Sequence, residues 1–298
     1  MNVQLRFVVT GVAGQVVKSL LESAHAYSDI EVIALGRPQL ELMNTESIAG
    51  IVRAASPDII VSAAAYTDVD RAEREPEIAF AVNSRASAAL ALVAKSMEIP
   101  IIQLSTDYVF DGRKDAPYVE NDWTNPLGIY GKSKLDGERA IATISKNHVI
   151  LRTSWIYSPF GRNFLRTMLH AAQAQSELKV VADQVGNPTS ALDLATAIVM
   201  IGKNLLTSDN LDLRGTFHLT GTGEASWADF AEEIFKASLT MGGPFAAIKR
   251  ISSEDYPAIA RRPVNSRLSC QRIQQLHAVS LPDWRVSAKE VVRRLIQE

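Results

Sequence analysis

The strongest constraint on the fold is the regular alternation, through the first half of the chain, of short β-branched runs with longer helical stretches. Runs rich in Val, Ile and Leu lie at 6–9, 31–35, 59–62, 101–104 and 148–152, and stretches with helical periodicity lie between them at 14–26, 45–55, 79–97 and 130–144. This alternation is typical of βαβ units around a parallel sheet. The sequence therefore predicts an α/β fold with a doubly wound parallel sheet.

The second half of the chain is less regular, and longer loops separate its elements. Strand-like runs at 178–182 and 217–219 alternate with helical stretches at 192–205, 227–240 and 287–297. We predict a Rossmann domain over 1–153 plus about 190–206, and a smaller mixed α/β domain over 154–189 and 207–298. Open α/β sheets bind ligands beyond the carboxyl ends of their strands, so the residues that follow the strands are the candidate site.

Composition limits the partners and the compartment. The chain has 298 residues, and 31 Lys and Arg against 33 Asp and Glu give a net charge of −2, which provides no overall basic field for nucleic acid or an anionic membrane. The single cysteine, Cys270, cannot form an internal disulfide and fits a reducing compartment. We find neither an export signal nor an apolar run long enough for a membrane span, and we expect a cytoplasmic protein. The five histidines have no ligand spacing, so no metal site is predicted.

A glycine turn, Thr10-Gly11-Val12-Ala13-Gly14-Gln15, follows the first predicted strand and opens the first predicted helix. Glycine lets the backbone turn tightly and approach a pyrophosphate, which a helix N-terminus attracts. Val17 stands where a third glycine is usual, and it predicts a slightly displaced helix. The turn therefore indicates a dinucleotide site, with an ordinary βα turn as the alternative.

The end of the second predicted strand bears on the choice of dinucleotide. NAD sites commonly have an acid here for the ribose 2′-hydroxyl, but this chain has Gly36 followed by Arg37. Arg37 is available to pair with a 2′-phosphate, or it is a solvated loop arginine. We therefore predict NADPH and leave NADH open.

Tyr130-Gly131-Lys132-Ser133-Lys134 places a phenol and an ammonium one helical turn apart on the same face. The ammonium is expected to lower the phenol pKa from about 10, so that Tyr130 serves as a general acid or base. Thr106, at the end of the preceding strand, offers a hydroxyl to a substrate oxygen. These three residues are the predicted catalytic group; the alternative is a surface Tyr–Lys pair.

Further motifs extend along the chain. They are Ala63-Ala64-Ala65-Tyr66-Thr67, Val69-Asp70-Arg71-Ala72-Glu73, Ser105-Thr106-Asp107-Tyr108-Val109-Phe110, Arg152-Thr153-Ser154-Trp155, Asp183-Gln184-Val185-Gly186-Asn187-Pro188-Thr189 and Arg262-Pro263-Val264-Asn265-Ser266. With these motifs, the glycine turn and the Tyr130–Lys134 pair, the chain resembles the extended short-chain dehydrogenases/reductases almost end to end. Within them it is similar to the dTDP-4-dehydrorhamnose reductases.

The resemblance implies reduction of the C4 ketone of dTDP-4-dehydro-6-deoxy-L-mannose. Tyr130 would donate the proton, Lys134 would hold the cofactor ribose and tune Tyr130, and Thr106 would polarise the carbonyl. The remaining positions implied for the cofactor are Gly11, Ala13, Gly14, Gln15, Val16, Glu41, Leu42, Ala63, Ala64 and Ala65. Asp107 and Trp155 would contact the sugar nucleotide.

Other residues have two interpretations each. Arg261 and Arg262 either clamp a diphosphate or form a solvated pair. The stretch 183–189 either lines the nucleotide pocket or is a turn before a helix that starts near Ser190. The remaining tryptophans, namely Trp123, Trp227 and Trp284, are expected to pack in the core or between the domains.

We expect the protein to be a monomer or a homodimer. Two other functions compete with that of a reductase. A nucleotide-sugar dehydratase would have Asp-Glu after the threonine, where this chain has Asp107-Tyr108, and an epimerase would retain tightly bound NAD. A non-catalytic NADP-binding regulatory subunit is the third possibility. Consumption of NADPH with a 4-keto sugar nucleotide distinguishes the reductase from the regulatory subunit.

Overall fold

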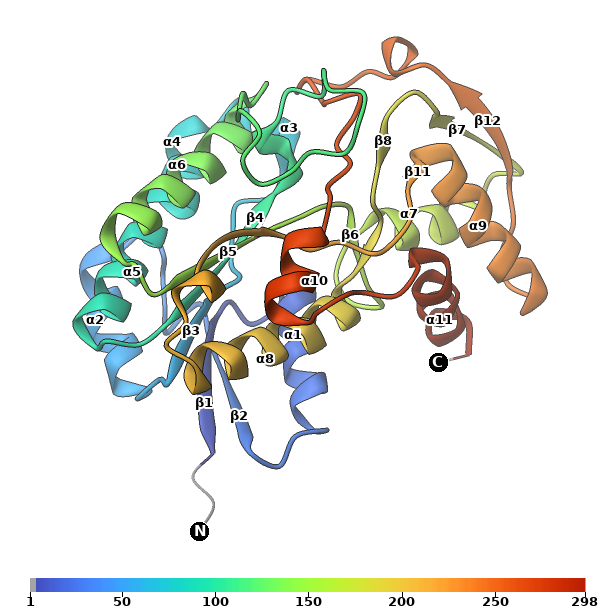
Figure 1. Cartoon of the computed structure of the whole chain (residues 1–298). Coiled ribbons are helices and arrows are strands. Elements are labelled where there is room, and N and C mark those ends of the chain that lie inside the picture. The colour runs from blue at the N-terminus through green and yellow to red at the C-terminus, as the bar shows by residue number, and fades with distance from the viewer. Residues whose placement is uncertain (1–3, 298) are drawn as a thin grey trace.

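The computed structural model describes residues 4–297, and its centre is a parallel sheet of six strands (Figure 1). From edge to edge the strands are β10 (Gly215–His218), β5 (His148–Thr153), β4 (Ile101–Thr106), β3 (Ile59–Ser62), β1 (Leu5–Thr10) and β2 (Ile30–Leu35). Every neighbouring pair is parallel. β2 lies on one side of β1, and β3, β4, β5 and β10 follow on its other side. This reversal of strand order opens a crevice at the carboxyl ends of the central strands.

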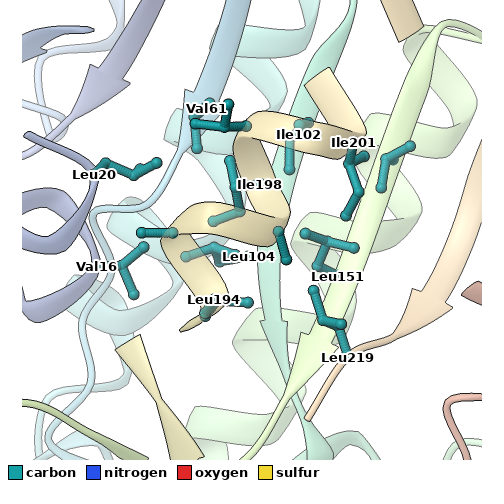
Figure 2. Packing of buried hydrophobic residues seen from close by; sticks show 14 of the residues in the cluster. Val16, Leu20, Val61, Ile102, Leu104, Leu151, Leu194, Ile198, Ile201 and Leu219 are labelled. Atoms are coloured by element: carbon teal, nitrogen blue, oxygen red, sulfur yellow. The ribbon is translucent and has the colours of Figure 1, made fainter. Parts of the chain in front are cut away.

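Helices cover both faces of this sheet, as the sequence predicts. On one face α2 (Thr45–Ala54), α5 (Ala86–Ser96) and α6 (Ile129–Ile144) enclose an apolar core. On the other, α1 (Gln15–Ala24) and α8 (Ala191–Thr207) pack against each other and on the strands. Figure 2 shows Leu194, Ile198 and Ile201 of α8 lying over apolar strand residues such as Ile102 and Leu151. This buried packing holds the strand ends, and therefore the site, in fixed positions.

The helical stretch predicted at 79–97 is longer and is interrupted. It consists of α4 (Pro76–Phe80), a π-helical turn at Ala81–Arg85 and α5. By length and composition the helical stretch Pro76–Ser96 could cross a membrane. Within it, 56% of the apolar 18-residue segment is buried inside the structure. Because α5 packs against α2 and α6, this stretch is a core element of the fold.

The remaining chain forms a second apolar core around α7 (Phe164–Ala171), α9 (Trp227–Thr240) and α11 (Trp284–Gln297). Beside them β7 (Glu177–Val181) and β12 (Ala247–Ile251) pair in parallel. Two pairs of two-residue strands complete it, β6 (Ile156–Tyr157) with β9 (Thr189–Ser190) and β8 (Val185–Gly186) with β11 (Ala225–Ser226). In Figure 1 this smaller part lies to the right of the large sheet.

One segment lies elsewhere than the sequence predicts. Residues 215–218, expected in the smaller domain, form β10 at the edge of the large sheet, beside β5. Phe217 is fully buried in the core that α8 shares with the strands, and α10 (Gln271–His277) packs against β10. Pairing covers the edge of β5, which would otherwise expose unpaired backbone groups.

Candidate active site

The glycine turn and the loop after β3 are tied together at the base of the crevice. The buried Thr10 hydroxyl accepts hydrogen bonds from the backbone N–H groups of Ala63 and Ala64, each at 3.0 Å. Gly11 has φ +98°, and a Cβ there would lie 3.3 Å from the Ala64 Cβ. Glycine is therefore required both by the backbone conformation and by the close approach of the loop.

The first turn of α1 is open to an anion. Gly14 precedes the helix without a side-chain cap, the turn holds no acidic residue, and Val12, Ala13 and Gly14 are exposed. The free N–H groups and the helix dipole favour a phosphate here. Val17 is buried in the core, and the Gln15 side chain accepts hydrogen bonds from Ser158 and Asn163 of the smaller part. These residues fit the pyrophosphate of a dinucleotide.

The structure gives a physical reason for Gly36. A Cβ at this position would lie 3.1 Å from the Val12 nitrogen and 3.2 Å from the Gly11 Cα, so any side chain would crowd the glycine turn. Arg37 is exposed, and within residues 4–297 no hydrogen bond or ion pair engages its guanidinium. Nearby, Leu42 is buried and the Glu41 carboxylate accepts a hydrogen bond from the Met43 N–H. Residues 36–40, directly after β2, thus hold one cation, Arg37, and no acid, and Glu41 is the first carboxylate beyond them.

Helix α6 is capped by a residue from another element. Its N-cap residue Gly128 has no side chain, and the first free N–H, of Ile129, donates to the Glu73 carboxylate at 2.7 Å. A Cβ on Gly128 would lie 2.5 Å from that carboxylate oxygen. Glu73 follows the short helix α3 (Val69–Ala72) and so fixes the turn that carries Tyr130. Sequence reasoning missed this role, because a cap across 56 residues leaves no local signal.

Tyr130 and Thr106 meet at the end of β4. Tyr130 is half-buried, and the ring of Tyr108 lies edge-on to it at 6.0 Å between centroids. Burial raises the pKa of Tyr130 to about 12, and the Thr106 hydroxyl beside it acts in the opposite direction. The expectation that Lys134 lowers this pKa is wrong for the structure, because desolvation of the phenol dominates and Lys134 has another partner. The phenol is therefore protonated at neutral pH, as a proton donor requires.

Lys134 lies one turn beyond Tyr130 and is almost fully buried. Its ammonium donates to the backbone carbonyl of Leu104 on β4 at 2.6 Å. Burial lowers the pKa of Lys134 to about 8, and the nearby carboxylate of Glu138 raises it. The ammonium is thus held at the carboxyl end of β4.

Asp107 is the buried acid of the site. Its Oδ1 accepts a hydrogen bond from the Thr106 hydroxyl at 2.9 Å, and among the described residues its Oδ2 has no hydrogen-bond partner. Burial raises the pKa of Asp107 to about 7, against the lowering effect of the nearby Ser266 and Thr106 hydroxyls. An unpaired buried carboxylate oxygen is costly, and a ligand hydroxyl would satisfy it.

Trp155 lies across the crevice on the side of the smaller core. It follows β5 in the left-handed region, with φ +47°, and its ring stacks on Trp227 of α9. A Cβ on Gly186 would lie 2.6 Å from the Trp155 ring. Trp227 was expected only to pack, so sequence reasoning missed its support of a site residue. Trp284 is buried as expected, whereas the expectation for Trp123 is wrong, since 86% of it is exposed.

Arg262 is not a free cation. Its guanidinium pairs with the Asp70 carboxylate at 3.0 Å, and Asp70 also accepts the N–H groups of Ile259 and Ala260. A diphosphate would have to share Arg262 with Asp70. Arg261 is exposed and lines a small hollow with Tyr130 and other residues of α3, α6 and the loops beside them.

Two further expectations concern loops and metals. Asn187, within the stretch 183–189, donates to the Gly223 carbonyl and accepts from the Leu268 N–H, so this stretch ties loops together. Within residues 4–297 no three His, Cys, Asp or Glu side chains are grouped to hold a metal ion.

Comparisons with known proteins identify the family of the chain. The family model described as the RmlD substrate binding domain matches residues 5–297. A dTDP-4-dehydrorhamnose reductase from Sinorhizobium fredii is 48% identical over 294 residues, 99% of each chain. A crystal structure of such a reductase from Clostridium acetobutylicum superposes with a TM-score of 0.90 at 33% identity, covering 99% of this chain and 100% of that one. The Bacillus anthracis reductase in complex with NADP has a TM-score of 0.89 at 30% identity, covering 98% and 99%.

Proposed function

The chain belongs to the RmlD substrate binding domain family, and from this premise we propose that it is an NADPH-dependent dTDP-4-dehydrorhamnose reductase. The reaction would convert dTDP-4-dehydro-6-deoxy-L-mannose to dTDP-L-rhamnose by reducing the C4 ketone. The observation that carries the proposal is the meeting of Thr106, Tyr130 and Lys134 at the end of β4, beside an open glycine turn.

Each of these side chains would have a separate role in ketone reduction. NADPH, when bound, supplies the hydride. Tyr130, whose pKa of about 12 keeps it protonated, donates its proton to the substrate O4. In the structure the Thr106 hydroxyl donates to the Asp107 carboxylate. With substrate bound, this hydroxyl would turn its single proton to the same oxygen as negative charge develops.

Cofactor and sugar nucleotide would occupy opposite sides of the crevice. The cofactor would bind at Gly11, Ala13, Gly14, Gln15 and Val16 through its pyrophosphate, at Lys134 through its ribose, and along Glu41, Leu42 and Ala63 to Ala65. Asp107, Trp155 and Arg262 would contact the sugar nucleotide. We retain the division into an NAD(P)-binding unit and a smaller sugar-nucleotide-binding unit, with β10 moved to the first.

The preference for NADPH is supported at the end of β2. Arg37 is exposed and, within the described chain, unpaired, so it is available to a 2′-phosphate. Gly36 provides no acid to bind a 2′-hydroxyl, and a side chain there would be tightly packed against the glycine turn. The NADP complex of the Bacillus anthracis relative is in keeping with this preference.

One assay tests the function directly. Purified protein is mixed with freshly generated 4-keto sugar nucleotide, in dTDP- and UDP-linked forms, and with NADPH or NADH, and cofactor absorbance is followed with product identification. We expect dTDP-L-rhamnose and consumption of NADPH. No consumption with any combination would refute the reductase and favour the regulatory subunit, whereas product without net cofactor consumption would favour the epimerase or dehydratase.

Other expectations belong to the proposal as well. We place the protein in the cytoplasm, as a monomer or a homodimer, with a small nucleotide-sugar substrate and with neither nucleic acid nor a membrane as partner. Sedimentation of the purified protein would test the oligomeric state.

A further inference from the structure

A buried ion pair lies behind the catalytic group, one turn of α6 beyond Lys134. The Arg152 guanidinium of β5 contacts the Glu138 carboxylate of α6 at 2.8 Å between Nη2 and Oε2, with a second contact of 3.0 Å from Nε to Oε1. Their side chains are only 6% and 4% exposed. The Ser105 hydroxyl of β4 also donates to Glu138. Three elements therefore meet at one carboxylate.

The contacts along this face of α6 all fall on the last three residues of β4. Tyr130 lies beside Thr106, Lys134 donates to the Leu104 carbonyl, and Glu138 accepts from Ser105. The helix residues are four apart, so they share one face. The strand partners are consecutive. A slip of the helix along β4 would break all three contacts together.

Gly131 and Gly137 flank this face of α6, and the helix is packed too closely at both for side chains there to set the register. A Cβ on Gly131 would clash with the Tyr108 carbonyl oxygen, and one on Gly137 would clash with the Asn83 carbonyl oxygen. The helix is thus pressed against backbone there. The bidentate Glu138–Arg152 pair is the directional contact that fixes its position, because a carboxylate and a guanidinium match in one geometry.

We propose that Glu138, held by Arg152 and Ser105, is a positioning residue that fixes α6 on β4 and β5 and thereby holds Lys134 and Tyr130 at the reaction centre. The inference rests on the proposed reductase function, since it assigns Lys134 to the cofactor ribose and Tyr130 to the ketone. Glu138 itself touches neither ligand in this account.

The charge of Glu138 gives this role a signature. Among residues 4–297, the titratable groups that meet this face of α6 are Tyr130 on the helix itself, Asp107 after β4 and Arg152 from β5. The π-helical turn contacts α6 through the uncharged Asn83 and through Ser84, which donates to Asp136, while its Arg85 pairs with Glu77. Glu138 raises the pKa of Lys134. Without this carboxylate the pKa of Lys134 should fall, so Lys134 should lose its proton at a lower pH.

The test compares Glu138→Gln with the double variant Glu138→Leu/Arg152→Leu, in which no buried charge of the pair remains. Glu31→Gln is the matched control, since it breaks an exposed Glu–Arg pair at Arg6 on strands β1 and β2. Thermal unfolding checks the fold, kcat and KM report the reaction, and NADPH fluorescence titration across pH 6–10 reports cofactor binding without any sugar nucleotide.

We expect both Glu138 variants to lose about 10- to 100-fold in kcat, because small displacements of reacting groups are costly. In Glu138→Gln the alkaline limb of NADPH binding should move down by about 0.5–1 pH unit, and the control should match the wild type. A folded double variant with wild-type kcat, or a folded Glu138→Gln variant with an unmoved alkaline limb, would overturn the proposal.

Two further results would still decide the role of Glu138. Should both Glu138 variants fail to fold, Ser105→Ala removes only the hydroxyl that donates to Glu138 and leaves the carboxylate charge in place. It should lower kcat without moving the limb down, and a wild-type kcat would count against the proposal. Should the wild type bind NADPH but reduce no sugar nucleotide, the proposed function fails, while the binding limb still decides the role of Glu138.

Discussion

Trp155 and Trp227 stack face to face, with ring centroids 3.6 Å apart and planes 7° from parallel. The first ring follows β5 and the second opens α9, so the stack joins the large sheet to the smaller core. It also holds in place the ring of Trp155, which is proposed to contact the sugar nucleotide. Two such large rings bury much apolar surface against each other.

Replacement of the supporting ring should therefore weaken substrate binding. We expect Trp227→Ala to raise the KM for the sugar nucleotide about tenfold, with the Kd for NADPH unchanged, because the cofactor side of the crevice is not touched. Steady-state kinetics and fluorescence titration measure the two constants. Trp123→Ala, at a ring that is 86% exposed, is the control and should leave both unaltered.

Removal of the phenolic hydroxyl tests the proton donor. Tyr130→Phe should lower kcat about 10²- to 10⁴-fold, since it deletes the general acid while keeping the ring beside Tyr108. NADPH affinity should stay within about twofold, because Lys134 retains its contact with the Leu104 carbonyl. Turnover at the wild-type rate would exclude Tyr130 as the proton donor.

The cofactor preference depends on a single exposed cation. Arg37→Ala should raise the KM for NADPH about tenfold and leave that for NADH nearly unchanged, since only the former carries a 2′-phosphate. Parallel kinetics with the two cofactors provide the internal control. Equal effects on both would indicate that Arg37 acts on the fold of the turn rather than on the phosphate.

Asp107 should make stability depend on pH. Its folded pKa of about 7 lies above the ordinary 3.8, so folding disfavours the charged form, and stability is lost as pH rises from about 4 to 7. Asp107→Asn removes this penalty and should stabilise the fold at pH 8 by roughly 2–4 kcal/mol, with little gain at pH 4. Thermal unfolding at both pH values decides: an equal gain at each would show that the carboxylate charge is not responsible.

The long, periodic elements could be predicted from sequence, and their ends differ from the structure by a few residues. The strand-end residues Thr106 and Trp155 could be placed for the same reason, since parallel strands present their carboxyl ends at one edge. The two-residue strands β6, β8, β9 and β11 could not, because so few residues carry no period.

Contacts between distant segments also have no sequence signal. Glu73 at the N-terminus of α6, Arg262 on Asp70 and Glu138 on Arg152 each join residues from different elements. The pKa of Tyr130 depends on burial, which a spacing of four residues cannot convey. For the same reason the sequence could not show that Arg262, interpreted as a possible diphosphate clamp, is already paired with Asp70.

The place of β10 has a consequence for biosynthesis. The nucleotide fold takes its last strand from Gly215–His218 and its covering helix α8 from Ala191–Thr207, well after the first five strands have been made. A nascent chain emerging from the ribosome therefore presents the edge of β5 uncovered until about three quarters of the polypeptide is synthesised. Fragments ending near residue 153 should aggregate through that edge, and the two units cannot be exchanged between relatives by a single crossover.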